Sequence, residues 1–112
     1  MNVNRVLLAG RLTRNPDLKR PDNVALATFG IAVNRRYTTK EGEKREDVTF
    51  IDCEAWGRTA ETIHQYVKKG DPLFVEGRLR FSQWDQDGQR RSRLTVTIER
   101  FEFVGEREKA RA

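Results

Sequence analysis

Cysteine, histidine and long apolar runs are all scarce in this sequence. Its single cysteine, Cys53, excludes an internal disulfide and is typical of proteins from a reducing compartment. No apolar run approaches the roughly 18 residues that a membrane-spanning helix needs. The opening residues MNVNRVLLAG do not have the layout of a signal peptide. We therefore expect a soluble cytoplasmic protein with no membrane partner.

Catalytic and metal-binding patterns are also missing. The only histidine, His64, lies on a predicted helix and not beside Cys53, so a Cys/His nucleophile pair is not expected. The sequence has no CxxC or HExxH motif, and its two Gly-Arg-Leu segments are not phosphate-binding loops. Asp52 and Glu54 share one strand face, which leaves a bound cation there as an alternative. We expect no enzyme activity, no metal and no cofactor.

The charge that is present has a definite sign and an uneven distribution. Lys and Arg number 22 against 17 acidic residues, which gives a net charge of +5. Residues 1–45 carry ten basic and four acidic side chains, residues 46–77 three and seven, and residues 78–112 nine and six. A basic surface attracts polyanions and gains free energy from the counterions that they release. The two flanking stretches are therefore candidates for contact with nucleic acid.

Apolar alternation predicts five strands, and apolar spacing of three to four residues predicts one helix. Asp87-Gly88 predicts a tight hairpin turn, and the polar segment Thr38–Glu46 predicts a flexible hairpin loop. The predicted strands are Val3–Thr13 with a bend at Gly10, Val24–Arg36, Val48–Trp56, a fourth marked by Leu73, Val75, Leu79 and Phe81, and a fifth marked by Leu94, Val96 and Ile98. The predicted helix is Thr59–Lys69, with Thr59 as its N-cap.

Three strands, a helix and two further strands follow one another in the order of an OB-fold. The predicted fold class is therefore all-β with one helix: a five-stranded barrel with the helix between strands 3 and 4. Residues 1–104 form this single domain, and residues 105–112 form a short charged end without a pattern, which we expect to be disordered. Val6–Ala9 is apolar on both strand faces, so one face fills the barrel and the other needs cover from a second subunit. A homo-oligomer is therefore expected.

Large aromatic residues fall on strand faces that should point away from the core. In the third strand, Thr49, Ile51, Cys53 and Ala55 form the inner face, and Val48, Phe50, Asp52, Glu54 and Trp56 form the outer one. In the fourth strand, Leu73, Val75, Leu79 and Phe81 share the inner parity, and Phe74, Glu76, Arg78, Arg80 and Trp84 share the outer one. Aromatic rings beside cations are the surface on which unpaired bases stack.

Two further groups repeat this arrangement. Tyr37 follows Arg35 and Arg36 at the mouth of a loop that ends at Arg45, and Trp84 lies on a hairpin whose far side carries Arg90, Arg91 and Arg93. The alternatives are that a second subunit or the helix covers the outward aromatics, or that Trp84 covers only a small local cluster. The combination of four aromatics with neighbouring cations favours a binding surface for single strands. The cations expected to contact phosphates beside these aromatics are Arg35, Arg36, Arg45, Arg78 and Arg90.

Short segments across the chain also resemble the DNA-binding domain of bacterial single-stranded DNA-binding proteins, from Asn4 to about Val104. The matching segments are NRVLLAGRL at 4–12, NPD at 15–17, AWGRTAE at 55–61, YVKKG at 66–70 and FVEGRL at 74–79. The resemblance implies base stacking on Tyr37, Phe50, Trp56 and Trp84, and phosphate contacts from Arg5, Arg58, Lys68, Lys69 and Arg80. It also implies a homotetramer that coats single-stranded DNA in replication, recombination and repair.

The sequence departs from the pattern of this family in three places. Tyr37 and Phe50 stand where tryptophan is frequent. Asp52 and Glu54 bring negative charge between Phe50 and Trp56, which we expect to weaken phosphate binding locally. The end at 105–112 lacks the acidic tip through which such proteins recruit replication and repair enzymes, so we expect no recruitment by this route. A dimeric primosomal relative and a regulator without a tail are the alternative interpretations.

Overall fold

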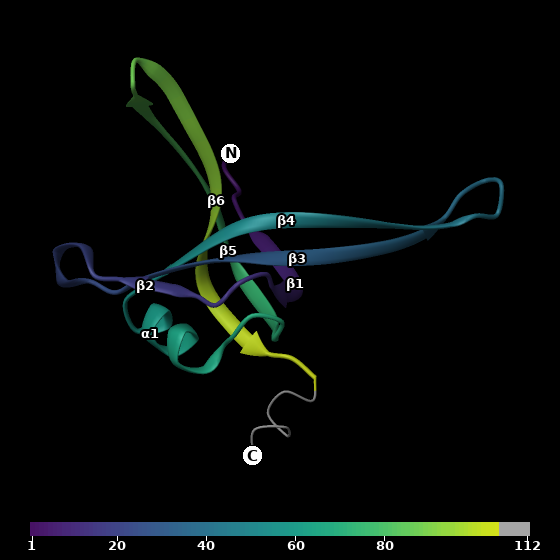
Figure 1. Ribbon diagram of the computed structural model, residues 1–112, viewed down its shortest axis with the longest axis horizontal. Coiled ribbons are helices and arrows are strands. Elements are labelled where there is room, and N and C mark those ends of the chain that lie inside the picture. Colours follow the sequence, from purple (N-terminus) through teal and green to yellow (C-terminus); the bar gives the residue numbers. More distant parts are fainter. Residues whose placement is uncertain (106–112) are drawn as a thin grey trace.

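The computed structural model describes residues 1–105, in which six strands and one α-helix follow one another along the chain (Figure 1). The elements are β1 (Val6–Leu12), β2 (Asp17–Lys19), a 3-10 turn (Pro21–Asn23), β3 (Leu26–Thr38), β4 (Lys44–Trp56), α1 (Gly57–Tyr66), β5 (Pro72–Gln86) and β6 (Gln89–Phe103). All five predicted strands and the predicted helix are present, with bounds that differ from the prediction. Only the short strand β2 was not foreseen.

The long strands close into a barrel. Their order is β1-β5-β6-β4-β3, and β1 also pairs with β3, so the sheet returns to its first strand. All neighbours are antiparallel except β4 and β6, which pair in parallel at Cys53 and Glu54 with Val96 and Thr97. The short strand β2 adds to the outer edge of β3. This is the predicted five-stranded OB-fold, with α1 between the third and fourth long strands.

Two glycines let backbones approach closely inside this barrel. At Gly10, where β1 passes from β5 to β3, a Cβ atom would lie 2.3 Å from the carbonyl oxygen of Ala32. At Gly77 it would lie 1.9 Å from the carbonyl oxygen of Thr97. The register irregularity falls between Glu76 and Gly77, so the strand bend that was expected at Gly10 is accompanied by a β-bulge elsewhere.

The barrel interior is filled by alternate residues of every long strand and by one face of α1. Its largest fully buried side chains are Phe29, Ile31, Ile63, Leu73, Val67, Val75, Val96 and Cys53. This confirms the inner parity predicted for Cys53 and Ala55 on β4. It contradicts the prediction for Leu79 and Phe81, which are 43% and 60% exposed. They have the inner parity, but they lie on β5 beyond Gly77, where its pairing with β1 ends.

The helix begins and ends earlier than predicted. It starts at Gly57, and within the described residues no side chain caps it, so the cap assigned to Thr59 is wrong. Its end at Tyr66 allows the next residue, Val67, to take an extended conformation and become fully buried. The following turn is then tied to β1, because the Gly70 N–H donates to the Leu12 carbonyl at 2.8 Å. Lys68 and Lys69 therefore lie in this turn and not in the helix.

Two hairpins extend beyond the barrel. The β3–β4 hairpin projects to the right in Figure 1, and the β5–β6 hairpin projects to the top. The first is longer than predicted, because strand pairing continues to Thr38 and Lys44 through part of the expected loop. Opposite charges face each other there, and such cross-strand pairs stabilise a ribbon that is polar on both faces. The Asp87-Gly88 turn is confirmed, with positive φ at both residues.

Over residues 1–105, no helix is long and apolar enough to cross a membrane.

Candidate nucleic-acid interface

The four aromatic side chains predicted to stack on bases are all exposed. Tyr37 is 36% exposed on β3, Phe50 and Trp56 are 73% and 42% exposed on β4, and Trp84 is 43% exposed on β5. Their outward direction follows from strand parity, since their neighbours Ile51 and Ala55 turn toward the core. The four aromatic rings therefore lie on three strands: two on β4, one on the β3 arm of the first hairpin and one on the β5 arm of the second.

Glu54 is the centre of a hydrogen-bond network on the outer face of the barrel. Its carboxylate accepts two hydrogen bonds from Arg80, from Nε at 2.8 Å and from Nη2 at 2.9 Å. It also accepts one from the Thr97 hydroxyl at 2.9 Å and one from the Trp56 indole Nε1 at 3.3 Å. The network joins β4, β5 and β6. It places a predicted stacking residue, Trp56, and a predicted phosphate contact, Arg80, against one buried carboxylate.

The electrostatics of this network correct the expectation that Glu54 weakens phosphate binding between Phe50 and Trp56. Glu54 is only 6% exposed, so its charge is not presented on the open surface between Phe50 and Trp56. Burial alone would raise the pKa of Glu54, but hydrogen bonds from Arg80, Thr97 and Trp56 and the charge of Arg80 lower it overall. The hydrogen bonds to Glu54, together with its negative charge, raise the pKa of Arg80. The pair is therefore ionised and mutually neutralised, and between Phe50 and Trp56 the exposed carboxylate is that of Asp52.

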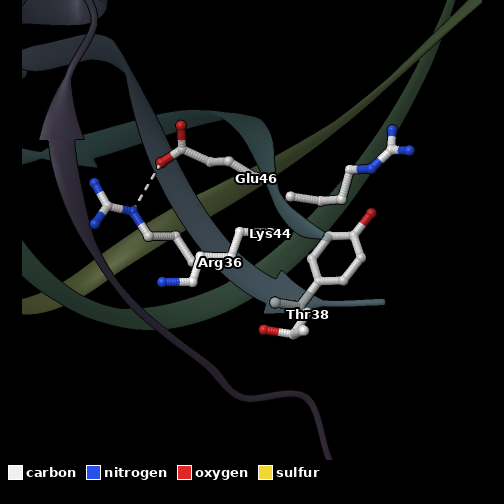
Figure 2. Close-up of a pocket in the computed structure, with 6 residues that line it drawn as sticks. Arg36, Thr38, Lys44 and Glu46 are labelled. Atoms are coloured by element: carbon white, nitrogen blue, oxygen red, sulfur yellow. Dashed lines mark hydrogen bonds and ion pairs between the residues drawn. The ribbon is translucent and has the colours of Figure 1, made fainter. Parts of the chain in front are cut away.

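The β3–β4 hairpin carries a second group of aromatic and basic side chains. The guanidinium of Arg35 lies over the Tyr37 ring, 4.6 Å from its centroid, and also contacts Asp47 at 3.1 Å. Arg45 lies directly opposite Tyr37 in the strand register. A hollow of about 500 Å³ opens here. Figure 2 shows its lining residues, four of them labelled, and marks the ion pair between Arg36 and Glu46, which measures 3.3 Å. Its lining residues are Arg36, Tyr37, Thr38, Lys44, Arg45 and Glu46.

Most of the predicted phosphate contacts already have an acidic partner. The pairs on the barrel and the β5–β6 hairpin are Arg5 with Glu76, Arg78 with Glu99 and Arg90 with Asp85, and those on the β3–β4 hairpin are Arg35 with Asp47, Arg36 with Glu46 and Arg45 with Glu43. Exposed ion pairs of this kind contribute little to stability, so a phosphate can replace the carboxylate at small cost. Within residues 1–105, neither Arg58 nor Lys69 makes an ion pair.

The structure also gives two pairings that the sequence prediction did not specify. Arg91 lies directly opposite Trp84 in the register of the β5–β6 hairpin. Thr97 holds Glu54 from the adjacent strand. Counting back from the Asp87-Gly88 turn would have found the first pair. No local signal points to the second, because β4 and β6 are far apart in the sequence.

Within residues 1–105, the structure contains neither an exposed thiol nor a cluster of metal-binding side chains. Cys53 is buried, and its pKa is raised to about 12 by burial and by the charge of Asp52, against the opposing effect of Arg14. In the described part of the chain, no three His, Cys, Asp or Glu side chains are close enough together to hold a metal ion. The cation considered at Asp52 and Glu54 would also compete with Arg80, which already neutralises the buried carboxylate.

Comparison with known proteins gives relatives over nearly the whole chain. A single-stranded DNA-binding protein of Helicobacter pylori is 45% identical over 103 residues, which cover 90% of this chain and 58% of that protein. The corresponding protein of Bacillus cereus is 43% identical over 104 residues, covering 91% and 60%. This chain therefore spans about three fifths of the length of these relatives.

Solved structures agree with this similarity. A deletion mutant of the single-stranded DNA-binding protein from Thermus aquaticus is 33% identical and superposes with a TM-score of 0.81, covering 92% of this chain and 51% of that chain. The Plasmodium falciparum SSB in complex with ssDNA shares the fold, with a TM-score of 0.85 at 21% identity and coverage of 94% and 97%. The family model described as "Single-strand binding protein family" matches residues 3–104. The chain belongs to this family.

Proposed function

We propose that this chain binds single-stranded DNA without sequence preference and has no catalytic activity. The observation that carries the proposal is that exposed aromatic side chains lie beside arginines on the outer faces of the strands of an OB barrel. Stacking is tolerant of sequence because every base has an aromatic face, and phosphate contacts carry no sequence information. The names of the relatives and the family membership support the same ligand.

In this proposal the bases stack on Tyr37, Phe50, Trp56 and Trp84. The phosphates contact arginines and lysines around these rings, some of which exchange an exposed carboxylate partner for the phosphate. The predicted set is Arg5, Arg35, Arg36, Arg45, Arg58, Lys68, Lys69, Arg78, Arg80 and Arg90. The biological role that follows is coating and protecting unpaired DNA during replication, recombination and repair, in the cytoplasm at the nucleoid.

The test is a titration with a short oligo-dT, followed by tryptophan fluorescence at two salt concentrations. We expect quenching, because stacked bases change the surroundings of Trp56 and Trp84. The affinity should fall with salt, with a slope of the logarithms near −0.7 per phosphate contacted. A duplex of matched length is the control. Equal affinity for the duplex and the single strand would contradict the proposal, because paired bases are not free to stack.

We also propose that the chain assembles with copies of itself, as a homotetramer. Leu7 on the outer face of β1 is 57% exposed, which supports the prediction that this strand needs cover from outside the barrel. The number four comes from the family resemblance. Light scattering at micromolar concentration tests the assembly, and a mass of one chain, 13.1 kDa, would contradict it.

A further prediction concerns the recruitment of other enzymes. The prediction that this chain does not recruit replication or repair enzymes through a tail concerns residues 105–112, of which 106–112 lie outside the described residues. It remains a prediction. Capture of a tail-reading repair enzyme by this polypeptide, in the absence of DNA, would contradict it.

A further inference from the structure

One buried carboxylate contacts two exposed members of the proposed interface. The side chain of Glu54 is 7% exposed, whereas that of Arg80 is 47% exposed. Trp56, whose indole N–H donates to the same carboxylate at 3.3 Å, is also exposed. Arg80 donates twice and Thr97 once. Within the described residues, the side-chain donors to Glu54 are therefore two exposed residues, Arg80 and Trp56, and one buried residue, Thr97.

We propose that Glu54 is a positioning residue of the single-strand interface: its carboxylate fixes the Trp56 indole and the Arg80 guanidinium side by side before DNA binds. This inference rests on the proposed function. Arginine and tryptophan side chains that are free to rotate lose conformational entropy when a ligand orders them. A network that orders them in advance removes part of this cost from the binding step.

The arrangement leaves both groups able to contact DNA. The hydrogen bond to Glu54 uses the edge of the Trp56 ring, so the aromatic face is not consumed. Arg80 has five N–H donors and uses two of them on Glu54. Its remaining donors can face a phosphate or a base. Glu54 thus holds the Arg80 cation and the Trp56 ring in one geometry. Its own negative charge is already paired with Arg80.

The alternative is that Glu54 acts only as a negative charge close to DNA. The two interpretations predict opposite signs. If charge alone matters, replacing Glu54 by the neutral glutamine removes repulsion and releases Arg80, so the affinity for DNA rises. If positioning matters, the same change loosens Arg80 and Trp56, so the affinity falls although the surface has become more positive.

The experiment compares Glu54→Gln with Asp52→Asn, which removes the same charge two residues away on the same strand face. Affinity for a labelled oligo-dT is measured by fluorescence anisotropy at one fixed salt concentration. We expect Glu54→Gln to bind about tenfold more weakly, as the loss of charge-assisted hydrogen bonds predicts. Asp52→Asn should bind as tightly as the wild type or more tightly. Unchanged or tighter binding by Glu54→Gln would overturn the proposal.

A second variant covers the case in which Glu54→Gln does not fold. Arg80→Lys keeps the positive charge at an exposed position but loses the planar fork that meets Glu54 with two bonds. Positioning predicts weaker binding by this variant as well, with melting temperature close to the wild type. If Arg80→Lys binds oligo-dT like the wild type, a point charge suffices and the proposal is overturned.

A readout without DNA separates this inference from the proposed function. The Trp56 indole N–H is observed by NMR in a Trp84→Phe background, in the wild-type and Thr97→Val forms. Positioning predicts that Thr97→Val, which removes one donor from Glu54, shifts the indole resonance and speeds its exchange with solvent. An unchanged resonance would overturn the proposal. A wild-type chain that shows the network but fails to bind oligo-dT would instead refute the proposed function.

Discussion

Arg80 donates two hydrogen bonds to Glu54, at 2.8 Å and 2.9 Å, from a different strand of the barrel. The pair joins β5 to β4 on the outer face, where the sequence pattern gave no reason to expect a buried charge. A buried carboxylate that is fully paired contributes to stability only while it is ionised. Its effects should therefore be visible both in folding and in binding.

The first prediction concerns the pH dependence of stability. Because the pKa of Glu54 is lowered below its ordinary 4.5 in the folded protein, its contribution is fully present above that value. It is lost as the pH falls through the lowered pKa, since the unfolded state then binds the proton more readily. Thermal unfolding of the wild type and Glu54→Gln measures this. Their difference in Tm should be largest near neutral pH and should narrow below about pH 4.

The control for this measurement is Asp52→Asn, which leaves the network intact. Its difference in Tm from the wild type should stay small, because Asp52 is exposed. A Tm difference for Glu54→Gln that did not change with pH would show that the carboxylate contributes through packing and not through its charge.

The second prediction concerns the two tryptophans. Trp56→Ala and Trp84→Ala should each lose about 1–3 kcal/mol of affinity for oligo-dT, the usual contribution of one stacked base. Both residues are more than two fifths exposed, so the fold should survive. Tyr66→Ala is a matched control, because Tyr66 is equally exposed but lies on α1 outside the predicted set. A variant that unfolds or loses its assembly would identify its tryptophan as part of a core or an interface.

The third prediction concerns the phosphate contacts. Arg58→Ala should weaken binding uniformly across sequences. It should also reduce the slope of log affinity against log salt concentration by about 0.7, the value for one phosphate on a single strand. Arg20→Ala provides the comparison, since Arg20 is outside the predicted set and pairs with Glu61 at 3.1 Å. Titrations at several salt concentrations give both slopes. If Arg58→Ala and Arg20→Ala reduced this slope equally, the change would come from net charge and not from a phosphate contact at Arg58.

The fourth prediction concerns the buried thiol. With a pKa of about 12, Cys53 is almost entirely protonated at about pH 8. Because the thiolate is the reactive form, the folded protein should react with iodoacetamide more than about a hundredfold more slowly than the unfolded chain. Mass spectrometry with and without guanidinium chloride measures this ratio. Rapid alkylation of the folded protein would show that β4 opens locally.

The fifth prediction concerns the bulge in the barrel wall. Gly77→Ala should destabilise the fold by about 1–3 kcal/mol or more, because the new methyl group meets the backbone of Thr97. Gly42→Asn is the control: nothing lies near Gly42, and asparagine tolerates its positive φ. Denaturant unfolding of both variants gives the comparison. If Gly77→Ala left the free energy of unfolding unchanged, β5 and β6 could move apart at this position without loss of stability.

Much of the fold could be predicted from the sequence because strand and helix periodicities are local properties. Alternation placed Phe50 and Trp56 on the face opposite Cys53, and the structure agrees. The Asp87-Gly88 turn was predictable for the same reason, since two adjacent residues with positive φ define it. The order of the elements then indicated the barrel.

Where each strand leaves the core, however, depends on the strands that cover it, and these are distant in the sequence. Leu79 has the parity of Leu73 and is nevertheless exposed, because β1 pairs with β5 only as far as Gly77 and does not cover this position. Glu54 has the parity of Phe50 and is nevertheless buried, because Arg80 and Thr97 reach it from β5 and β6. Periodicity determined which face each residue takes. Only the closure of the barrel decided which residues of other strands cover that face.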